Sequence, residues 1–109
     1  MTHTLKTFPE YFEAVLSGAK PFEVRREDDK TFAVGDTLIL REWDFNRLPE
    51  SVRAWYGALS RDTLDALSAD AYTGRECSVT VTYVLRGFIG LEPGYAVLGI
   101  RLDRQEDAE

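Results

Sequence analysis

The chain has 109 residues, 44% of them hydrophobic, and a formal net charge of −6. This length and apolar content predict one domain, over residues 1–109, that buries its own core without a disulfide or a structural metal. The negative charge argues against a general nucleic-acid coat, because that kind of binding depends on clustered Lys and Arg. It still allows a local basic cleft.

The chain contains a single cysteine, Cys77, and a single histidine, His3. One cysteine forms no intramolecular disulfide, and one Cys with one His makes no metal site unless carboxylates supply most of the ligands. We therefore expect no metal or cofactor, and a cytoplasmic location. The chain starts without an apolar leader and has no apolar run near the ~20 residues of a membrane helix, so we expect no membrane association.

The first predicted helix covers about residues 8–17. Thr7-Phe8-Pro9-Glu10 has the form of a capping box with proline in the first turn. Gly18 supplies a residue that accepts the left-handed conformation at the helix end. Lys20 lies just after the end of the helix, and the helix dipole alone would favour a cation at that position. Five residues repeat with helical spacing and predict one buried stripe: Phe8, Tyr11, Phe12, Val15 and Leu16.

The stretch Gly18-Ala19-Lys20-Pro21-Phe22-Glu23-Val24-Arg25-Arg26 is the densest polar signal in the chain. Its second half alternates apolar and charged residues, which is typical of a strand. We expect this strand to bury Phe22 and Val24 and to present Glu23 and Arg25 as an ion pair on the opposite face. Such a pair needs no function, since an exposed ion pair contributes roughly 0–1 kcal/mol.

A second strand is predicted over 37–43. Its first half is apolar on both parities, which favours burial on both faces, and Trp43 lies where it emerges. The next segment, 46–71, lacks β-branched alternation and predicts a helical insertion with helices over 49–57 and 60–67. Ser60 is a candidate cap for the second helix.

β character then returns. Residues 76–86 alternate and predict a long half-buried strand, on which Cys77 has the apolar parity of an inert core residue. Glu92-Pro93-Gly94 predicts a type II turn before a closing strand over 95–102. The tail, 103–109, holds four acids and one base and reads as a solvated end.

These elements predict an α+β domain. Its core would be a small, mostly antiparallel sheet of four to six strands, curled into a partial barrel, with an N-terminal capping helix and the helical insertion.

The run Gly18-x-Lys20-x-x-Glu23-x-Arg25 resembles the G-x-K-x-x-E-x-R motif of ASCH domains, members of the PUA-like superfamily. The similarity to small bacterial and phage ASCH-like RNA-binding proteins covers nearly the whole chain except about 46–71. There, family members usually run almost directly from the tryptophan strand into a Tyr-Thr-Gly-Arg element. The further matching segments are His3-x-Leu5-Lys6, Pro9-Glu10-Tyr11-Phe12, Phe32-x-Val34-Gly35-Asp36-x-Leu38, Leu40-Arg41-Glu42-Trp43-Asp44, Tyr72-Thr73-Gly74-Arg75 and Gly94-Tyr95-x-Val97.

The resemblance implies a PUA-like β-barrel with a cleft between barrel and helix, and RNA or a modified nucleoside or nucleotide as ligand. In this interpretation Lys20 and Arg25 contact phosphate or a carbonyl, and Glu23 orients Arg25 or accepts from a base edge. Trp43 or Tyr72 would stack on a base. The candidate binding residues are Lys6, Lys20, Glu23, Arg25, Arg26, Trp43, Tyr72 and Arg75.

A hydrolase acting on a modified nucleoside or on RNA is an alternative, with Lys20 and Glu23 as acid and base. One branch of ASCH proteins hydrolyses acetylcytidine with a lysine, a threonine three residues later and a distal glutamate. Here Glu23 stands at the threonine position, so that mechanism does not carry over directly. A metal-assisted ribonuclease would instead use Glu23 with Asp28 and Asp29. His3 is a further candidate base, or else a surface residue or strand-end cap.

A third interpretation is a protein-interaction module. The 46–71 insertion would then bind a protein partner through Trp55 and Tyr56, provided that these rings are exposed rather than packed on the barrel.

Overall fold

The structure is a computed structural model that describes residues 1–60, 63, 66 and 69–103. The first half of the chain forms β1 (Thr2–Thr7), α1 (Pro9–Ser17), β2 (Phe22–Arg26) and β3 (Thr37–Trp43). Next come η1 (Phe45–Arg47), α2 (Glu50–Ala54), η2 (Tyr56–Ala58) and η3 (Ala69–Ala71), where η denotes a single 3₁₀ turn. The last strands are β4 (Tyr72–Leu85) and β5 (Tyr95–Leu102).

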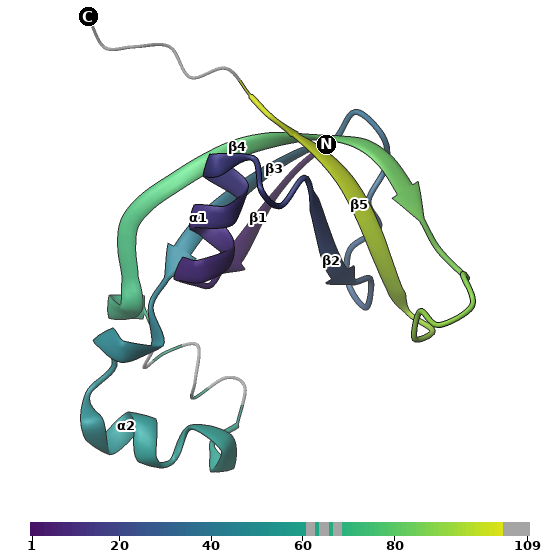
Figure 1. The fold of residues 1–109 in the computed structure, drawn as a ribbon. Coiled ribbons are helices and arrows are strands. Elements are labelled where there is room, and N and C mark those ends of the chain that lie inside the picture. The colour runs from purple at the N-terminus through teal and green to yellow at the C-terminus, as the bar shows by residue number, and fades with distance from the viewer. Residues whose placement is uncertain (61–62, 64–65, 67–68, 104–109) are drawn as a thin grey trace, which may run out of the picture.

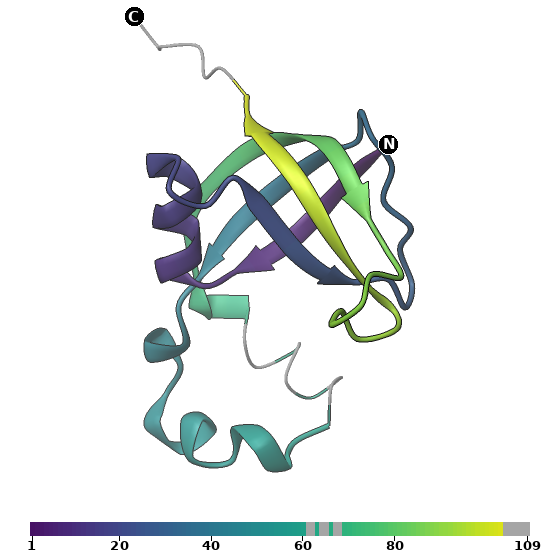
Figure 2. The same ribbon diagram turned by 45° about the vertical axis from the view of Figure 1, so that its right-hand side comes forward.

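The five strands form one sheet in the order β1-β3-β4-β5-β2. β1 and β3 are parallel, and the other neighbouring strands are antiparallel. The sheet curls into a half-barrel, and the long β4 arches over α1 (Figure 1). β1 and β2 are its edge strands, and α1 lies beside the sheet in the connection between them (Figure 2). The predicted α+β class and the mostly antiparallel, curled sheet are confirmed.

A bulge in β4 contributes to the curl. The register of β4 against β5 shifts between Val81 and Tyr83, and Tyr83 pairs with Gly99. A Cβ atom at Gly99 would lie 3.0 Å from Thr82 Oγ1 and 3.3 Å from Tyr83 Cβ. Glycine therefore permits the close approach at the bulge, where twist increases and the strand bends.

The main core fills the inside of the curl with alternate residues of the strands and one face of α1. Cys77 is buried in it, as predicted. Burial, with a smaller contribution from the negative charge of Glu23, raises the pKa of the Cys77 thiol to about 11, which keeps the sulfur protonated and unreactive. The buried core residues are Leu5, Phe12, Val15, Phe32, Leu38, Leu40, Cys77, Val79, Val81, Ala96, Leu98 and Ile100.

Helix α1 agrees with its prediction in extent but not in its cap. Gly18 has φ of +84° and ends the helix, as expected. The cap residue is Phe8, without a side-chain cap bond, so the predicted capping box is wrong. Thr7 is instead the buried last residue of β1. Phe12 and Val15 of the apolar stripe are buried, whereas Phe8 and Tyr11 are exposed.

The predicted orientation of the strand after α1 is wrong. In β2, Phe22 and Val24 are 41% and 46% exposed, while Glu23 is only 2% exposed. β2 is an edge strand of the half-barrel, and its inward face carries the carboxylate of Glu23, which has two cationic partners. Burying a paired charge is tolerable, so hydrophobicity alone does not decide which face points inward.

Strand β3 alternates instead of being buried on both faces. Leu38 and Leu40 are fully buried, whereas Thr37 and Ile39 on the other face are partly exposed. β4 begins at Tyr72, before the predicted start at 76, and the closing strand and the turn at Gly94 are confirmed.

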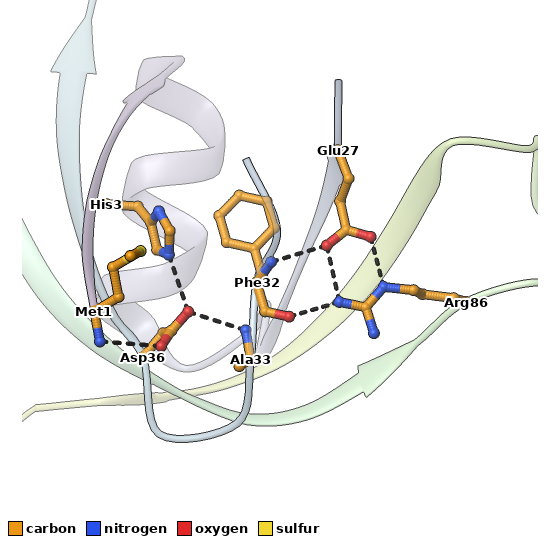
Figure 3. A network of polar contacts seen from close by, with 7 residues as sticks. All are labelled: Met1, His3, Glu27, Phe32, Ala33, Asp36 and Arg86. Carbon is orange, nitrogen blue, oxygen red and sulfur yellow. Dashed lines mark hydrogen bonds and ion pairs between the residues drawn. The ribbon is translucent and has the colours of Figure 1, made fainter. Parts of the chain in front are cut away.

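Strand β1 is not predicted from the hydrophobic pattern. It contains His3, and the interpretation of His3 as a surface residue is wrong. His3 is buried, and its Nε2 lies 2.9 Å from Asp36 Oδ2 (Figure 3). The same carboxylate accepts a hydrogen bond from Ala33 N–H at 2.9 Å and pairs with the amine of Met1 at 3.2 Å. Asp36 thus joins β1 to the loop before β3.

A second group of contacts closes the same end of the barrel. Arg86, just after β4, pairs with Glu27 through two hydrogen bonds of 2.6 and 2.9 Å. It also donates to the Phe32 carbonyl, and Glu27 accepts from Phe32 N–H (Figure 3). The hydrogen bond from Arg86 lowers the pKa of the Glu27 carboxyl. The loop after β2 is therefore tied to the end of β4 at Glu27.

The insertion packs on the far end of β3. Trp43, Leu48 and Ala71 form a second buried cluster, with Tyr56 and Tyr72 packed against it. α2 is shorter than the predicted helix over 49–57, and the helix predicted over 60–67 falls largely outside the described residues, as does most of the tail. Within the part that is described, no helix is both long and apolar enough to cross a membrane.

We expect Asp36→Asn to destabilise the protein in a pH-dependent way. Hydrogen bonding, chiefly from His3, outweighs burial and lowers the pKa of Asp36 from 3.8 to about 2. A lowered folded-state pKa gives stability that is present above pH 4 and is lost as the pH falls toward 2, here about 2 kcal/mol. Urea unfolding should show that difference from wild type at pH 7 and little of it at pH 2.

Asp29→Asn, in the exposed turn after β2, is the control and should match wild type at both values of pH. Equal midpoints for Asp36→Asn and wild type at pH 7 would contradict the role of this carboxylate.

Candidate functional site

A cavity of about 530 Å³ lies between α1 and the two edge strands of the sheet. β1 and the start of α1 contribute one wall, and Lys20, which follows the helix, contributes the other together with β2. Four of the eight predicted binding residues line it. The complete lining is Lys6, Thr7, Phe8, Tyr11, Lys20, Phe22, Glu23, Val24 and Arg25.

The buried carboxylate of Glu23 organises the polar part of this cavity. Lys20 Nζ donates to Glu23 Oε2 at 2.5 Å, and Arg25 Nε donates to Oε1 at 2.9 Å. The side chains of Lys20 and Arg25 are 18% and 23% exposed, against 3% for Glu23. Both oxygens of the inner carboxylate are thus neutralised by cations that still reach the cavity.

Arg25 also connects the two edges of the half-barrel. Its Nη2 donates to the carbonyl of Lys6 at 3.1 Å and to Thr7 Oγ1 at 3.3 Å, both on β1. β1 and β2 stand at opposite ends of the strand order. A single guanidinium, with its fixed fork of donors, therefore links strands that the sheet itself does not pair.

The helix end sets the position of Lys20. After Gly18 turns into the left-handed conformation, the backbone N–H of Lys20 donates to the carbonyl of Ala14 at 3.0 Å. The ammonium then lies 5.3 Å from the ring centroids of both Tyr11 and Phe22. Contacts of this kind favour a cation, so aromatic rings and Glu23 together hold Lys20 against the cavity.

The cavity is a positive region on a negative protein. Lys6, Lys20 and Arg25 line it with one carboxylate, a local charge of +2, whereas the chain as a whole carries −6. Side chains of one sign that line a concave surface focus the field and attract ligands of the opposite sign.

Lys6 is exposed and covers Trp43. Its Nζ lies 4.2 Å from the centroid of the Trp43 ring. Trp43 is 0% exposed and packs in the second core cluster. The structure therefore gives Trp43 no free face for stacking on a base, and the tryptophan supports Lys6 instead.

Three other predicted residues have partners away from this cavity. Arg26 pairs with Asp28 at 3.0 Å and lies over Tyr95, and Tyr72 lies under the guanidinium of Arg41. Arg75 pairs with Glu13 at 2.7 Å on α1. The structure does not bring these three together with Lys20 and Glu23.

Sequence reasoning missed the aromatic part of the lining. The hydrophobic pattern predicts that Phe8, Tyr11 and Phe22 are buried, and the structure places them at the cavity. One signal was available for α1, because its apolar stripe is wider than the face that a short helix buries. No comparable signal distinguished Phe22 from a core residue.

The residues proposed for a metal-assisted ribonuclease do not converge. Asp28 pairs with Arg26 and is largely exposed, whereas Glu23 is buried beside Lys20. Among the described residues, no group of three or more His, Cys, Asp or Glu side chains is arranged to hold a metal ion.

The two rings of the insertion that were candidates for contact with a protein partner differ in exposure. Trp55 of the insertion is 65% exposed, but Tyr56 packs against Trp43.

Fold and cavity together define a small curled-sheet protein with a basic, aromatic cleft beside its first helix. Residues 2–100 match the model of the domain of unknown function DUF3850, and the chain belongs to that family. It is also 46% identical over 41 residues to an uncharacterised 12.9 kDa protein encoded in the GpA 3′ region of Escherichia phage P2. That match covers 38% of this chain and 37% of the phage protein.

We expect Arg25→Met to destabilise the fold by about 3 kcal/mol, because it removes the link between β1 and β2 and half of the charge compensation of buried Glu23. Lys20→Met should cost less, since Arg25 still neutralises the carboxylate. Urea unfolding measures both effects.

Arg26→Met, the next residue of the same strand, is the matched control, and we expect less than about 0.5 kcal/mol for this exposed side chain. Equal unfolding midpoints for the Arg25 and Arg26 variants would show that the link between the edges adds no stability.

Proposed function

We propose that this chain is an RNA- or nucleotide-binding module of the ASCH type, with a PUA-like barrel, and that its ligand occupies the cavity between α1 and β2. The observation that carries the proposal is the combination of net positive charge and exposed aromatic rings in one cavity of an acidic protein. Phosphate groups and bases need these two kinds of partner.

Three cations would contact the ligand in different ways. Lys6 is exposed above the Trp43 ring, where a phosphate would be able to approach its ammonium. Lys20 and Arg25 are held by Glu23, so they are preorganised for a phosphate or a base carbonyl and lose little side-chain freedom on binding. Because Glu23 already accepts from both, its main role in this proposal is to orient them.

Stacking would come from the rings at the cavity. Phe8, Tyr11 and Phe22 are all exposed, in contrast to Trp43. A base stacked on such a ring gains roughly 1–3 kcal/mol. The proposed stacking residues therefore replace Trp43 and Tyr72 of the sequence-based hypothesis.

The motif resemblance supports the same place. Lys20, Glu23 and Arg25 are the charged positions of the G-x-K-x-x-E-x-R element, and all three line this cavity. An interaction that only stabilised the strand would not require the two cations to face a hollow of this size.

Binding to a six-nucleotide single-stranded RNA tests the proposal by fluorescence anisotropy at several salt concentrations. We expect Lys6→Gln to weaken binding several-fold and to reduce the salt slope by about 0.7, the value for one phosphate contact on a single strand. Phe22→Ala should weaken binding about tenfold through lost stacking. Both side chains are exposed, so the folded state should persist.

Arg101→Gln removes one exposed positive charge on β5 and is the control for net charge. Absence of RNA and nucleotide binding by the wild type, or equal losses in all three variants, would refute the proposed site.

Hydrolysis of a modified nucleoside is a second candidate, favoured by the close contact of Lys20 with Glu23 at the cavity wall. In that reaction Glu23 would take a proton from water as the oxygen attacks an amide carbon, and Lys20 would protonate the leaving nitrogen. Both oxygens of Glu23 already accept hydrogen bonds from cations, which makes this carboxylate a weaker base. We therefore rank binding above hydrolysis.

Release of acetate from N4-acetylcytidine tests this second function. Turnover by the wild type that is lost in Glu23→Gln, with an unchanged circular dichroism spectrum, would establish it. No turnover at high protein concentration would refute this amide hydrolysis.

A further inference from the structure

A second cavity, of about 420 Å³, adjoins the first on the other side of Phe8. The start of α1, the segment after β3 and Tyr56 of the insertion surround it. Its lining is Phe8, Pro9, Glu10, Trp43, Asp44, Phe45, Asn46 and Tyr56.

Two residues connect the cavities. Phe8 lines both, and its ring centroid lies 6.4 Å from that of Tyr11 and 5.8 Å from that of Trp43. Lys6 lines the first cavity and covers the ring of Trp43, which borders the second. A positive charge therefore stands at the junction.

The second cavity is lined by aromatic and acidic side chains. Phe45 and Tyr56 meet edge to face with centroids 5.1 Å apart, and the exposed Phe8 faces the same hollow. Trp43 is fully buried beneath them, so a ligand would meet the other rings first. Glu10 and Asp44 bring two carboxylates, so the charge of this lining is opposite in sign to that of the first cavity.

We infer that the second cavity is a subsite for the base of a neighbouring nucleotide, so that the ligand is a dinucleotide step of single-stranded RNA. The inference rests on the proposed function of the first cavity. One nucleotide occupies the cavity of Lys20 and Arg25, the linking phosphate lies at Lys6, and the next base stacks among Phe8, Phe45 and Tyr56.

The charges select both the class of ligand and the base. Carboxylates repel a phosphate but accept hydrogen bonds, so the second cavity suits the uncharged, aromatic part of a nucleotide. Glu10 and Asp44 favour a base with an amino group, such as adenine, over uracil, whose exocyclic groups are acceptors. A basic peptide fits less well, because the neighbouring cavity of charge +2 repels it.

Calorimetric titrations with AMP, UMP, pApA and pUpU test this inference on the full chain. We expect the wild type to bind pApA about tenfold more tightly than AMP, the gain of one stacked base. Phe45→Ala should bring the affinity for pApA down to that for AMP and leave AMP unchanged. Phe88→Ala, which removes an exposed ring from the loop after β4, is the matched control.

A second variant keeps the test independent of aromatic packing. Glu10→Gln with Asp44→Asn preserves the size of both side chains, and the Asn oxygen can still accept the Asn46 N–H bond that Asp44 makes. It should reduce the preference for pApA over pUpU and leave the ratio of AMP to UMP affinity unchanged.

The possible outcomes separate the two proposals. Equal affinity for AMP and pApA, unaffected by Phe45→Ala, would overturn the second subsite and leave the proposed function standing. No binding of any of the four probes or of longer RNA would overturn both. If neither the wild type nor the Glu10→Gln, Asp44→Asn double variant prefers pApA to pUpU, the assigned role of the carboxylates would be overturned.

Discussion

The interaction on which the rest of this structure depends is the buried carboxylate of Glu23 between Lys20 and Arg25. An unpaired carboxylate at this depth would carry a large desolvation penalty, and the two cations remove it. The same contacts fix three parts of the fold, because Lys20 follows α1, Glu23 belongs to β2, and Arg25 reaches the last residues of β1. The contacts that neutralise Glu23 therefore also link the two edge strands of the half-barrel.

The position of this feature explains why the cavity is basic on an acidic protein. Satisfying one inner carboxylate required two cations at the rim, which with Lys6 leave a local positive charge. The rings of Tyr11 and Phe22 flank Lys20 and limit its movement. A site whose charged groups are held by the fold itself binds with less loss of side-chain freedom, which is the physical basis of the proposed nucleotide binding.

The insertion adds to this arrangement. Tyr56 packs on Trp43, which lies beneath Lys6, so the segment between β3 and β4 is in contact with the wall of the cleft. The carboxylates of Glu10 and Asp44 line the second cavity, which shares Phe8 with the first. The two cavities therefore differ in the sign of the charge on their lining, which is the physical basis of the proposed orientation of a dinucleotide.

The sequence by itself determined α1 and its glycine stop, β3 and β5, an inert Cys77, and the cluster of Lys20, Glu23 and Arg25, because each depends on local periodicity, turn chemistry or a short motif. Only the tertiary structure decided that β2 turns Glu23 inward and that β1 pairs in parallel with β3 over His3, since these depend on partners distant in the chain. It also decided that Phe8, Tyr11 and Phe22 face a cavity while Trp43 is buried. The hydrophobic pattern predicts which residues tend to be buried. The relative position of α1, β1 and β2 decides which of these residues line a cavity instead.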